Sequence, residues 1–343
     1  MEYELSKIFD PYETRPLQII ARALKKERLA HAYLITGMDR TITTKAAISA
    51  ANLLLCEQPK DDKVIRPCGE CKACLKVSRE THPDLIVVEP EGATIKIDQI
   101  KTIQKQFIFQ PLEGKKRIAV ISQADTLGIY AGNALLKILE EPPPYAHLIL
   151  GASTPKALLQ TVVSRCQHLP LGSLPARSIS SFLKQAGMDN SYVQKMSEGS
   201  LSKATYFIES DLIGFRDKFI EFLKKEDRWE SLLLNLAQKG SQDNDSFKLL
   251  LHIITSVIHD MMILNKFKGK SFNSLDKVLF CPDIQEDLVV LAIKFDNYLL
   301  EEYASHVMNM ETHLSRNANK LLMALSLLLF WKNKKFGRVT AYG

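Results

Sequence analysis

The sequence lacks the features that would place it in a membrane or export it. The longest apolar stretch near the C-terminus, residues 321–331, is far shorter than the roughly 20 residues that a membrane span needs, and we expect it to be a buried helix. The first residues, 1–4, show neither the basic start nor the apolar run of a secretory signal. We therefore expect a cytoplasmic protein with no membrane partner.

Strong charge of either sign is also absent. The net charge is +6 over 343 residues, a mild basic balance that permits contact with nucleic acid without requiring it. The basic segment 332–338 is expected to be a solvated end, with phosphate contact as the alternative. A hydrophobic fraction of 46% is typical of a soluble globular protein, and the length predicts two or three domains. We find no internal repeat and no low-complexity segment.

Cysteine is scarce, but four of the six cysteines lie close together, at Cys56, Cys68, Cys71 and Cys74. Two-residue gaps let neighbouring thiolates turn back onto one ion, and four thiolates complete the tetrahedral shell of zinc. Such a closed shell leaves no position for a reactive water, so the site would stabilise the fold and perform no chemistry. A cytosolic chain favours metal over disulfides. Redox cysteines and unreactive thiols are the alternatives.

Strands and helices alternate along the first half of the chain. The strands are continuous apolar runs, which is typical of a parallel sheet covered on both faces. The helix at 132–141 is stopped by three prolines. The predicted strands are 32–36, 84–88, 117–121 and 147–152, and the predicted helices are 45–55, 98–109 and 132–141.

The second half changes character, because no convincing strand follows residues 171–175. Residues 177–208 predict three short helices, and 212–334 predict longer ones with apolar positions three and four apart. The clearest loops are 240–245 and 266–277.

The loop after the first strand stands where a phosphate-binding loop belongs, but it has lost most of the required residues. Such loops use glycines so that backbone N–H groups can wrap the phosphates, together with a lysine and a Ser/Thr that holds magnesium. Gly37, Thr43 and Thr44 are what remains of this pattern. Lys45 comes two residues too late, and Asp39 places negative charge where a phosphate would lie. The sequence therefore predicts no productive binding of ATP.

The third strand gives a second, independent sign. In ATP-hydrolysing motors this strand ends in acidic residues that hold magnesium-bound water and activate the attacking water. Here Ser122 and Gln123 follow the strand, and neither can act as a general base. Asp125 lies too far along to be assumed equivalent. The first domain is thus expected to be an ATPase scaffold that does not hydrolyse ATP; an unrelated α/β fold is the alternative.

Several motifs together resemble the bacterial DNA polymerase III clamp-loader family. The resemblance covers nearly all of residues 15–172, and residues 317–322 are similar to the last helices of that family. The defective loop and missing acidic pair resemble its delta-prime type. The motifs are HAYL at 31–34, the cysteine module at 56–74, NALLKILEEPP at 133–143, ASTP at 152–155 and SRC at 164–166.

The resemblance implies an α/β plus all-α fold of the AAA+ class. Its parts would be a RecA-like parallel-sheet domain carrying the zinc module, a small three-helix lid and a C-terminal helical collar used in oligomerisation. The module departs from the usual family spacing through a charged insert at 60–63, but we expect it still to close on zinc. The expected domains are 1–172, 173–209 and 210–343.

The family's function supplies the expected partners and one further site residue. The resemblance implies a five-subunit assembly with gamma/tau ATPase subunits and a delta subunit, which opens the sliding clamp and places it on primer-template DNA. It also implies that Arg165, in Ser164-Arg165-Cys166, points into a neighbour's ATP site as an arginine finger. Lys203 falls where related ATPases sense phosphate, but a solvated helix residue is expected. An ATP-hydrolysing gamma/tau-type motor and a free-standing zinc DNA-binding protein are the alternatives.

Overall fold

The structure is a computed structural model, and it describes residues 8–225, 229–267, 275, 278–314 and 318–337. The chain forms two compact units. Unit 1 comprises the residues up to 182 together with 199–203, and unit 2 comprises 183–198 and the residues from 204 onward. The three domains expected at 1–172, 173–209 and 210–343 stay predictions.

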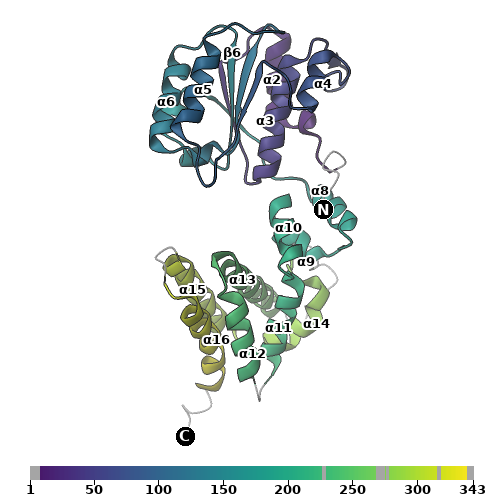
Figure 1. The fold of residues 1–343 in the computed structure, drawn as a ribbon. Helices are drawn as coiled ribbons and strands as arrows, with labels where there is room; N and C mark the ends of the chain where they lie inside the picture. The colour runs from purple at the N-terminus through teal and green to yellow at the C-terminus, as the bar shows by residue number, and fades with distance from the viewer. Residues whose placement is uncertain (1–7, 226–228, 268–274, 276–277, 315–317, 338–343) are drawn as a thin grey trace. The chain divides into compact units, whose positions relative to one another are not determined.

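Unit 1 is built on a sheet of five strands that are all parallel (Figure 1). Its strand order is β4-β5-β6-β1-β7, so β1 pairs with β6 on one side and with β7 on the other. Every residue of β1, β5 and β6 is buried, which explains their continuous apolar sequences. The strands are β1 Ala32–Thr36, β4 Leu85–Val88, β5 Arg117–Ile121, β6 Ala146–Ala152 and β7 Gln167–Pro170.

Helices cover both faces of this sheet. On one face, α5 (Ile97–Phe107) and α6 (Ile129–Glu140) pack with the buried side chains of β5 and β6, including Leu148 and Leu150 (Figure 1). On the other face, α2 (Arg15–Lys25) and α3 (Arg40–Leu55) pack against Ile149 of the same strand. The expected α/β plus all-α fold class, a parallel sheet followed by helical segments, is confirmed.

The sequence pattern identified four of these five strands and did not identify β7. Leu169 is the one buried residue of β7, so the strand has no apolar run. The helix predicted to begin at Lys45 begins at Arg40, because Asp39 caps it. A short hairpin, β2–β3, also begins in the charged insert and ends just after it. The remaining short elements are η1 Pro11–Glu13, β2 Lys60–Asp61, β3 Ile65–Arg66, α4 Lys72–Ser78, η2 Ala124–Thr126, η3 Pro155–Ala157 and α7 Gln160–Val163.

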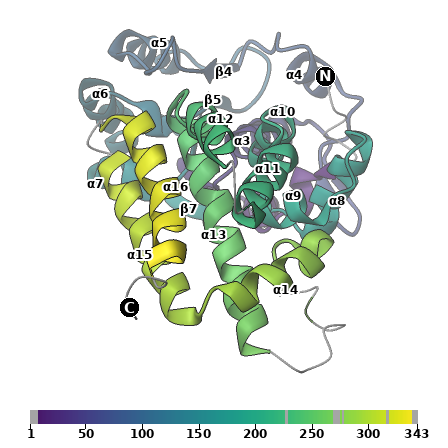
Figure 2. The same cartoon turned by 90° about the horizontal axis from the view of Figure 1, so that it is seen from below.

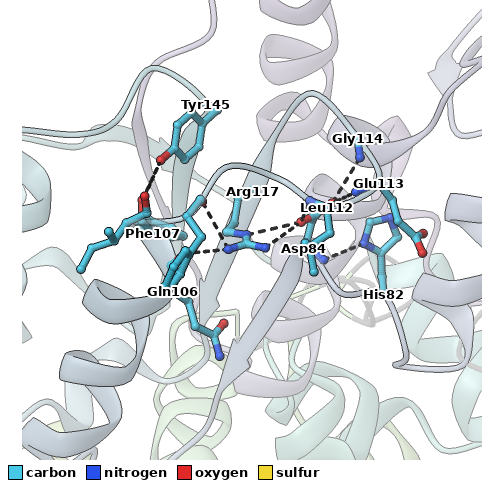
Figure 3. Close-up of polar contacts among 11 residues, drawn as sticks. His82, Asp84, Gln106, Phe107, Leu112, Glu113, Gly114, Arg117 and Tyr145 are labelled. Atoms are coloured by element: carbon cyan, nitrogen blue, oxygen red, sulfur yellow. Dashed lines mark hydrogen bonds and ion pairs between the residues drawn. The ribbon is translucent and has the colours of Figure 1, made fainter.

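A buried ion pair holds the loop between α5 and β5 (Figure 3). Arg117, the first residue of β5, donates from Nη2 to Oδ1 of Asp84 at 3.0 Å. Asp84 accepts the backbone N–H groups of residues 112–114 at 2.7 to 3.2 Å. Arg117 also donates from Nη1 to the carbonyls of Gln106 and Phe109. The Arg117–Asp84 pair therefore holds both the beginning and the end of the loop between α5 and β5.

Three short helices follow the sheet, as expected for residues 177–208: α8 Ala176–Gln185, α9 Ser191–Met196 and α10 Leu201–Glu209. Unit 2 is helical throughout the residues that are described. Its α13 is the longest helix, and α15 and α16 run side by side (Figure 2). Its further elements are α11 Leu212–Lys224, α12 Glu230–Gly240, α13 Asn244–Lys266, η5 Pro282–Ile284, α14 Gln285–Lys294, α15 Asn297–Leu314 and α16 Lys320–Gly337.

By length and composition, α13 is apolar enough to cross a membrane, but 67% of the relevant window is buried inside the protein. The core helix of a folded domain passes the same test. Most of the loop predicted at 266–277 lies outside the described residues. The predicted loop at 240–245 is shorter in the structure, because α12 extends to Gly240 and α13 starts at Asn244.

The expectation of a solvated basic end is wrong at Lys332, whose side chain is buried at 1% exposure. Its Nζ donates to the carbonyl oxygens of Phe222 and Lys225 at 2.7 and 2.6 Å and lies 4.6 Å from the centroid of the Phe222 ring. These carbonyls are at the end of α11, where helical partners run out. Lys332 therefore caps the C-terminal end of α11. The sequence did not reveal this contact, because Lys332 stands at the start of a basic segment that is typical of a solvated end.

Candidate functional site

The predicted phosphate loop lies at the carboxyl end of β1, the edge at which open α/β sheets bind ligands. Gly37 and Thr43 come together there, because Thr43 Oγ1 lies 3.3 Å from the carbonyl oxygen of Gly37. The same Oγ1 donates to the carbonyl of Asp39 at 2.7 Å. A Cβ added to Gly37 would lie 2.8 Å from the same Oγ1, so the loop is closely packed. Thr44 and Lys45 line a different groove. Burial lowers the pKa of Lys45 below its ordinary value.

Asp39 occupies the start of α3 and is only 6% exposed. Its Oδ1 accepts the backbone N–H of Ile42 at 3.0 Å, which is the N-cap contact. Its carboxylate also accepts the Oγ of Ser200 at 3.0 Å and the backbone N–H of Ser202 at 2.8 Å. Sequence reasoning placed the negative charge of Asp39 here but missed both serines. The Gly199-Ser200-Leu201-Ser202 pattern, rich in small hydroxyl residues, was the available signal.

The residues after β5 have different surroundings. Ser122 is fully buried, and Gln123 has a left-handed backbone with φ of 53°. Asp125 Oδ2 lies 3.4 Å from Nη2 of Arg40 and accepts the Oγ of Ser153 at 3.2 Å. Asp125, the first carboxylate after β5, is thus paired with Arg40 of the predicted phosphate loop.

The four cysteines of the module come together, with all four sulfur atoms within 4.8 Å of one another. The sulfurs of Cys56 and Cys68 are 3.7 Å apart, and those of Cys68 and Cys74 are 3.9 Å apart. Four sulfurs at about 2.3 Å from one zinc ion would be about 3.8 Å apart, so the spacing fits tetrahedral zinc. The cluster can hold a metal ion such as zinc.

The backbone around the cluster prepares these thiols to act as ligands. Cys71 caps α4, and the N–H groups of Cys68, Cys71 and Cys74 each point at the preceding cysteine sulfur at 3.3 to 3.4 Å. Backbone hydrogen bonds from Glu70 and Cys71 lower the pKa of Cys68 to about 6, which favours the thiolate that binds metal. Burial raises the pKa of Cys56 and Cys74, which are the interior pair.

Arg165 lies just after α7, in a turn where its own N–H bonds the carbonyl of Val162 at 3.1 Å. Its Nη1 donates to the carbonyl of Thr161 at 3.0 Å, and its Nη2 lies 2.8 Å from Oε1 of Glu140. The Arg165 and Glu140 side chains are 36% and 50% exposed, so this is a surface ion pair. The guanidinium is therefore held in place but remains accessible.

The other singled-out residues have structural surroundings. Cys166 packs against the core on the α6 face, and burial raises its pKa to about 12. Cys281 is fully buried, and burial raises its pKa as well. Lys203 donates its backbone N–H to the Oγ of Ser200 at 3.2 Å. The prediction of a buried thiol is confirmed for Cys281, whereas Cys166 is only partly buried.

Comparison with known proteins shows which family this chain resembles. Residues 12–175 match the family described as DNA polymerase III, delta subunit. The DNA polymerase III subunit delta′ of Bacillus subtilis is 35% identical over 173 residues, which is 50% of this chain and 51% of that protein. The delta′ subunit of Pseudomonas aeruginosa is 39% identical over 147 residues, 41% of this chain and 44% of that protein. Residues 12–175, slightly less than half of the chain, therefore resemble the DNA polymerase III clamp-loader family.

The clamp-loader match spans about half the length of these curated relatives. The tau subunit of Bacillus subtilis is 31% identical over 221 residues, which is 62% of this chain and 38% of that protein. Among solved structures, a gamma subunit-related protein of Thermotoga maritima is 18% identical with a TM-score of 0.45, covering 93% of this chain and 99% of that one. The predicted resemblance to the clamp-loader family, and to its delta-prime type, is confirmed by the family match over residues 12–175 and by the two delta′ relatives.

Proposed function

We propose that this chain is a clamp-loader subunit that does not hydrolyse ATP and supplies Arg165 to the ATP site of a neighbouring subunit. Its partners would be the gamma/tau and delta subunits, which together load the sliding clamp onto primer-template DNA in the bacterial cytoplasm. The observation that carries the proposal is the state of the phosphate loop. Its anion position holds the Asp39 carboxylate, while the accessible Arg165 lies on a different segment, after α7.

The contacts of Arg165 suit a residue that acts on a second chain. An exposed ion pair such as Arg165–Glu140 contributes about 0 to 1 kcal/mol, so a phosphate can replace the carboxylate of Glu140 at little cost. The guanidinium fork matches phosphate oxygens and stabilises the charge that spreads over the transferring γ-phosphoryl group. Such an arginine accelerates hydrolysis by about three to five decades.

The alternative is an ATP-hydrolysing motor of the gamma/tau type. The tau match extends over more of this chain than the delta′ matches do, which favours it. Against it stand Ser122 and Gln123 after β5, together with an Asp125 that is held by Arg40. A motor would need that carboxylate to be available to magnesium and water.

The cysteine module has a supporting role in this proposal. With zinc bound by Cys56, Cys68, Cys71 and Cys74, the module would join the end of α3 to α4 and the β2–β3 hairpin. The closed thiolate shell gives the metal no catalytic position, so its contribution is to stability alone.

The test is a reconstituted clamp loader in which this subunit carries Arg165→Ala. Clamp- and DNA-stimulated ATP turnover is expected to fall while the complex still assembles. Arg165→Lys should not restore turnover, because an ammonium lacks the planar fork. Glu140→Ala removes the resting partner and Arg22→Ala removes an exposed arginine of α2, and both should leave turnover unchanged. Unchanged turnover in Arg165→Ala would refute the finger role.

A further inference from the structure

The carboxylate of Asp39 is surrounded by donors in the way that a bound oxyanion would be. One donor is the N–H of Ile42 in the first turn of α3, where the helix dipole favours negative charge. The others come from a segment about 160 residues further along the chain: the Oγ of Ser200, and both the N–H and the Oγ of Ser202. Helix N-termini bind phosphate through the same kind of N–H groups.

The segment that supplies these donors is closely fitted to unit 1. Gly199 has φ of +80°, and its carbonyl accepts the N–H of Leu174 at 3.0 Å. A Cβ added to Gly199 would lie 2.6 Å from the carbonyl oxygen of Leu174, so this position has no room for a side chain. Residues 199–203 belong to unit 1, although the residues on both sides of them belong to unit 2.

We propose that Asp39 is a built-in substitute for a phosphate group, which docks residues 199–203 on unit 1 in the absence of nucleotide. In a nucleotide-binding ATPase, an exchangeable phosphate at the start of this helix can gather donors from separate segments. Here one chain provides both the anion and its donors, so the contact is permanent. The inference goes beyond the proposed function, and it does not depend on the role of Arg165.

Hydrogen exchange of the backbone amide of Ser202, measured in the full-length isolated chain, tests the contact directly. Asp39→Ala should accelerate this exchange roughly tenfold or more, because hydrogen bonds to charged groups are the stronger class. Asp243→Ala is the matched control. Asp243 is also an N-cap aspartate, accepting the N–H of Ser246 at 2.6 Å at the start of α13. That variant should leave Ser202 exchange unchanged.

Anion rescue separates a phosphate substitute from an ordinary helix cap. In Asp39→Ala, inorganic phosphate should restore part of the protection of Ser202, and in the wild type it should have no effect. Loss of protection without rescue would refute the substitute role, and unchanged exchange in a folded Asp39→Ala would refute the docking itself.

A second variant covers the case in which Asp39→Ala does not fold. The double variant Ser200→Ala/Ser202→Ala removes both hydroxyl donors and leaves the Asp39 cap on Ile42 intact. It should accelerate exchange at Ser202 without changing exchange in α3. Equal exchange in this variant and the wild type would contradict the proposal. ATP turnover by a reconstituted loader, which tests Arg165, is a separate readout.

Discussion

Arg117 and Asp84 form an ion pair whose side chains are 6% and 0% exposed. Removing two charges from water is costly, and the mutual attraction offsets this cost only when the remaining donors and acceptors are satisfied. Here they are, because Asp84 accepts the N–H groups of residues 112–114 and Arg117 donates to the carbonyls of Gln106 and Phe109. The pair therefore serves to organise a loop that has no regular secondary structure of its own.

Arg117→Ala is expected to destabilise unit 1 by about 3–5 kcal/mol, because it leaves the Asp84 carboxylate buried without its counter-charge. The free energy of opening, measured by hydrogen exchange of the β5 amides, reports the change. Lys76→Ala is the control, since its ion pair with Glu113 is exposed and should contribute less than about 1 kcal/mol. Equal losses in the two variants would contradict the role given to the buried pair.

The same pair makes the stability of unit 1 depend on pH. Burial raises the pKa of Asp84, but hydrogen bonds from the N–H groups of Glu113 and Leu112 and from Arg117 outweigh burial, so its pKa is lowered. The unfolded state then takes up the proton first, with a pKa of about 3.9. The stabilisation is complete above that value and is lost as the pH falls through the lower folded pKa.

Asp84→Asn tests this linkage. The variant should be less stable than the wild type near neutral pH, and the gap should narrow as the solution is acidified below about pH 4. Unfolding by denaturant at a series of pH values measures the gap. A gap that stays constant down to acid pH would show that Asp84 does not titrate with folding.

The cysteine module should carry about one equivalent of zinc in the purified protein. Cys71→Ser removes one of four ligands, so bound metal and thermal stability should both fall, and a chelator should have the same effect on the wild type. Cys166→Ser changes a thiol outside the module and should retain the metal. Undiminished metal and stability in Cys71→Ser would exclude the four-thiolate site.

The isolated chain should neither bind nor hydrolyse ATP. A fluorescent ATP analogue in magnesium buffer, followed for saturable binding and for release of phosphate, measures both. Asp39 repels the phosphates, and the loop between Gly37 and Lys45 lacks the required glycines. Tight binding with turnover would instead favour the gamma/tau-type motor.

Local patterns in the sequence predicted the features whose residues are close together in the chain. Continuous apolar runs revealed β1, β4, β5 and β6, since strands buried on both faces must be apolar at every position. The cysteine module was found for a related reason, because its ligands follow one another at short intervals. The edge strand β7 escaped, since three of its four residues are exposed.

The contacts that the sequence did not reveal join distant residues. The charge of Asp39 was visible in the sequence, and residues 199–202 are rich in small hydroxyl residues. No local pattern, however, paired Ser200 and Ser202 with Asp39. Asp84 and Arg117 likewise follow no spacing rule, because sheet topology alone brings them together. Long-range pairing of this kind depends on the whole fold, which periodicity does not specify.

The burial of Lys332 means that unit 2 can complete its folding only after its last described helix has been synthesised. Its ammonium group closes the end of α11 and lies near the ring of Trp229, although it comes from α16, the last described helix. During synthesis, domains fold as they leave the ribosome, from the N-terminus onward. The sheet of unit 1 can therefore form while translation continues, whereas α11 stays uncapped until α16 has emerged. A chain that ends before Lys332 would therefore be expected to fold unit 1, while the end of α11 in unit 2 would lack its capping lysine.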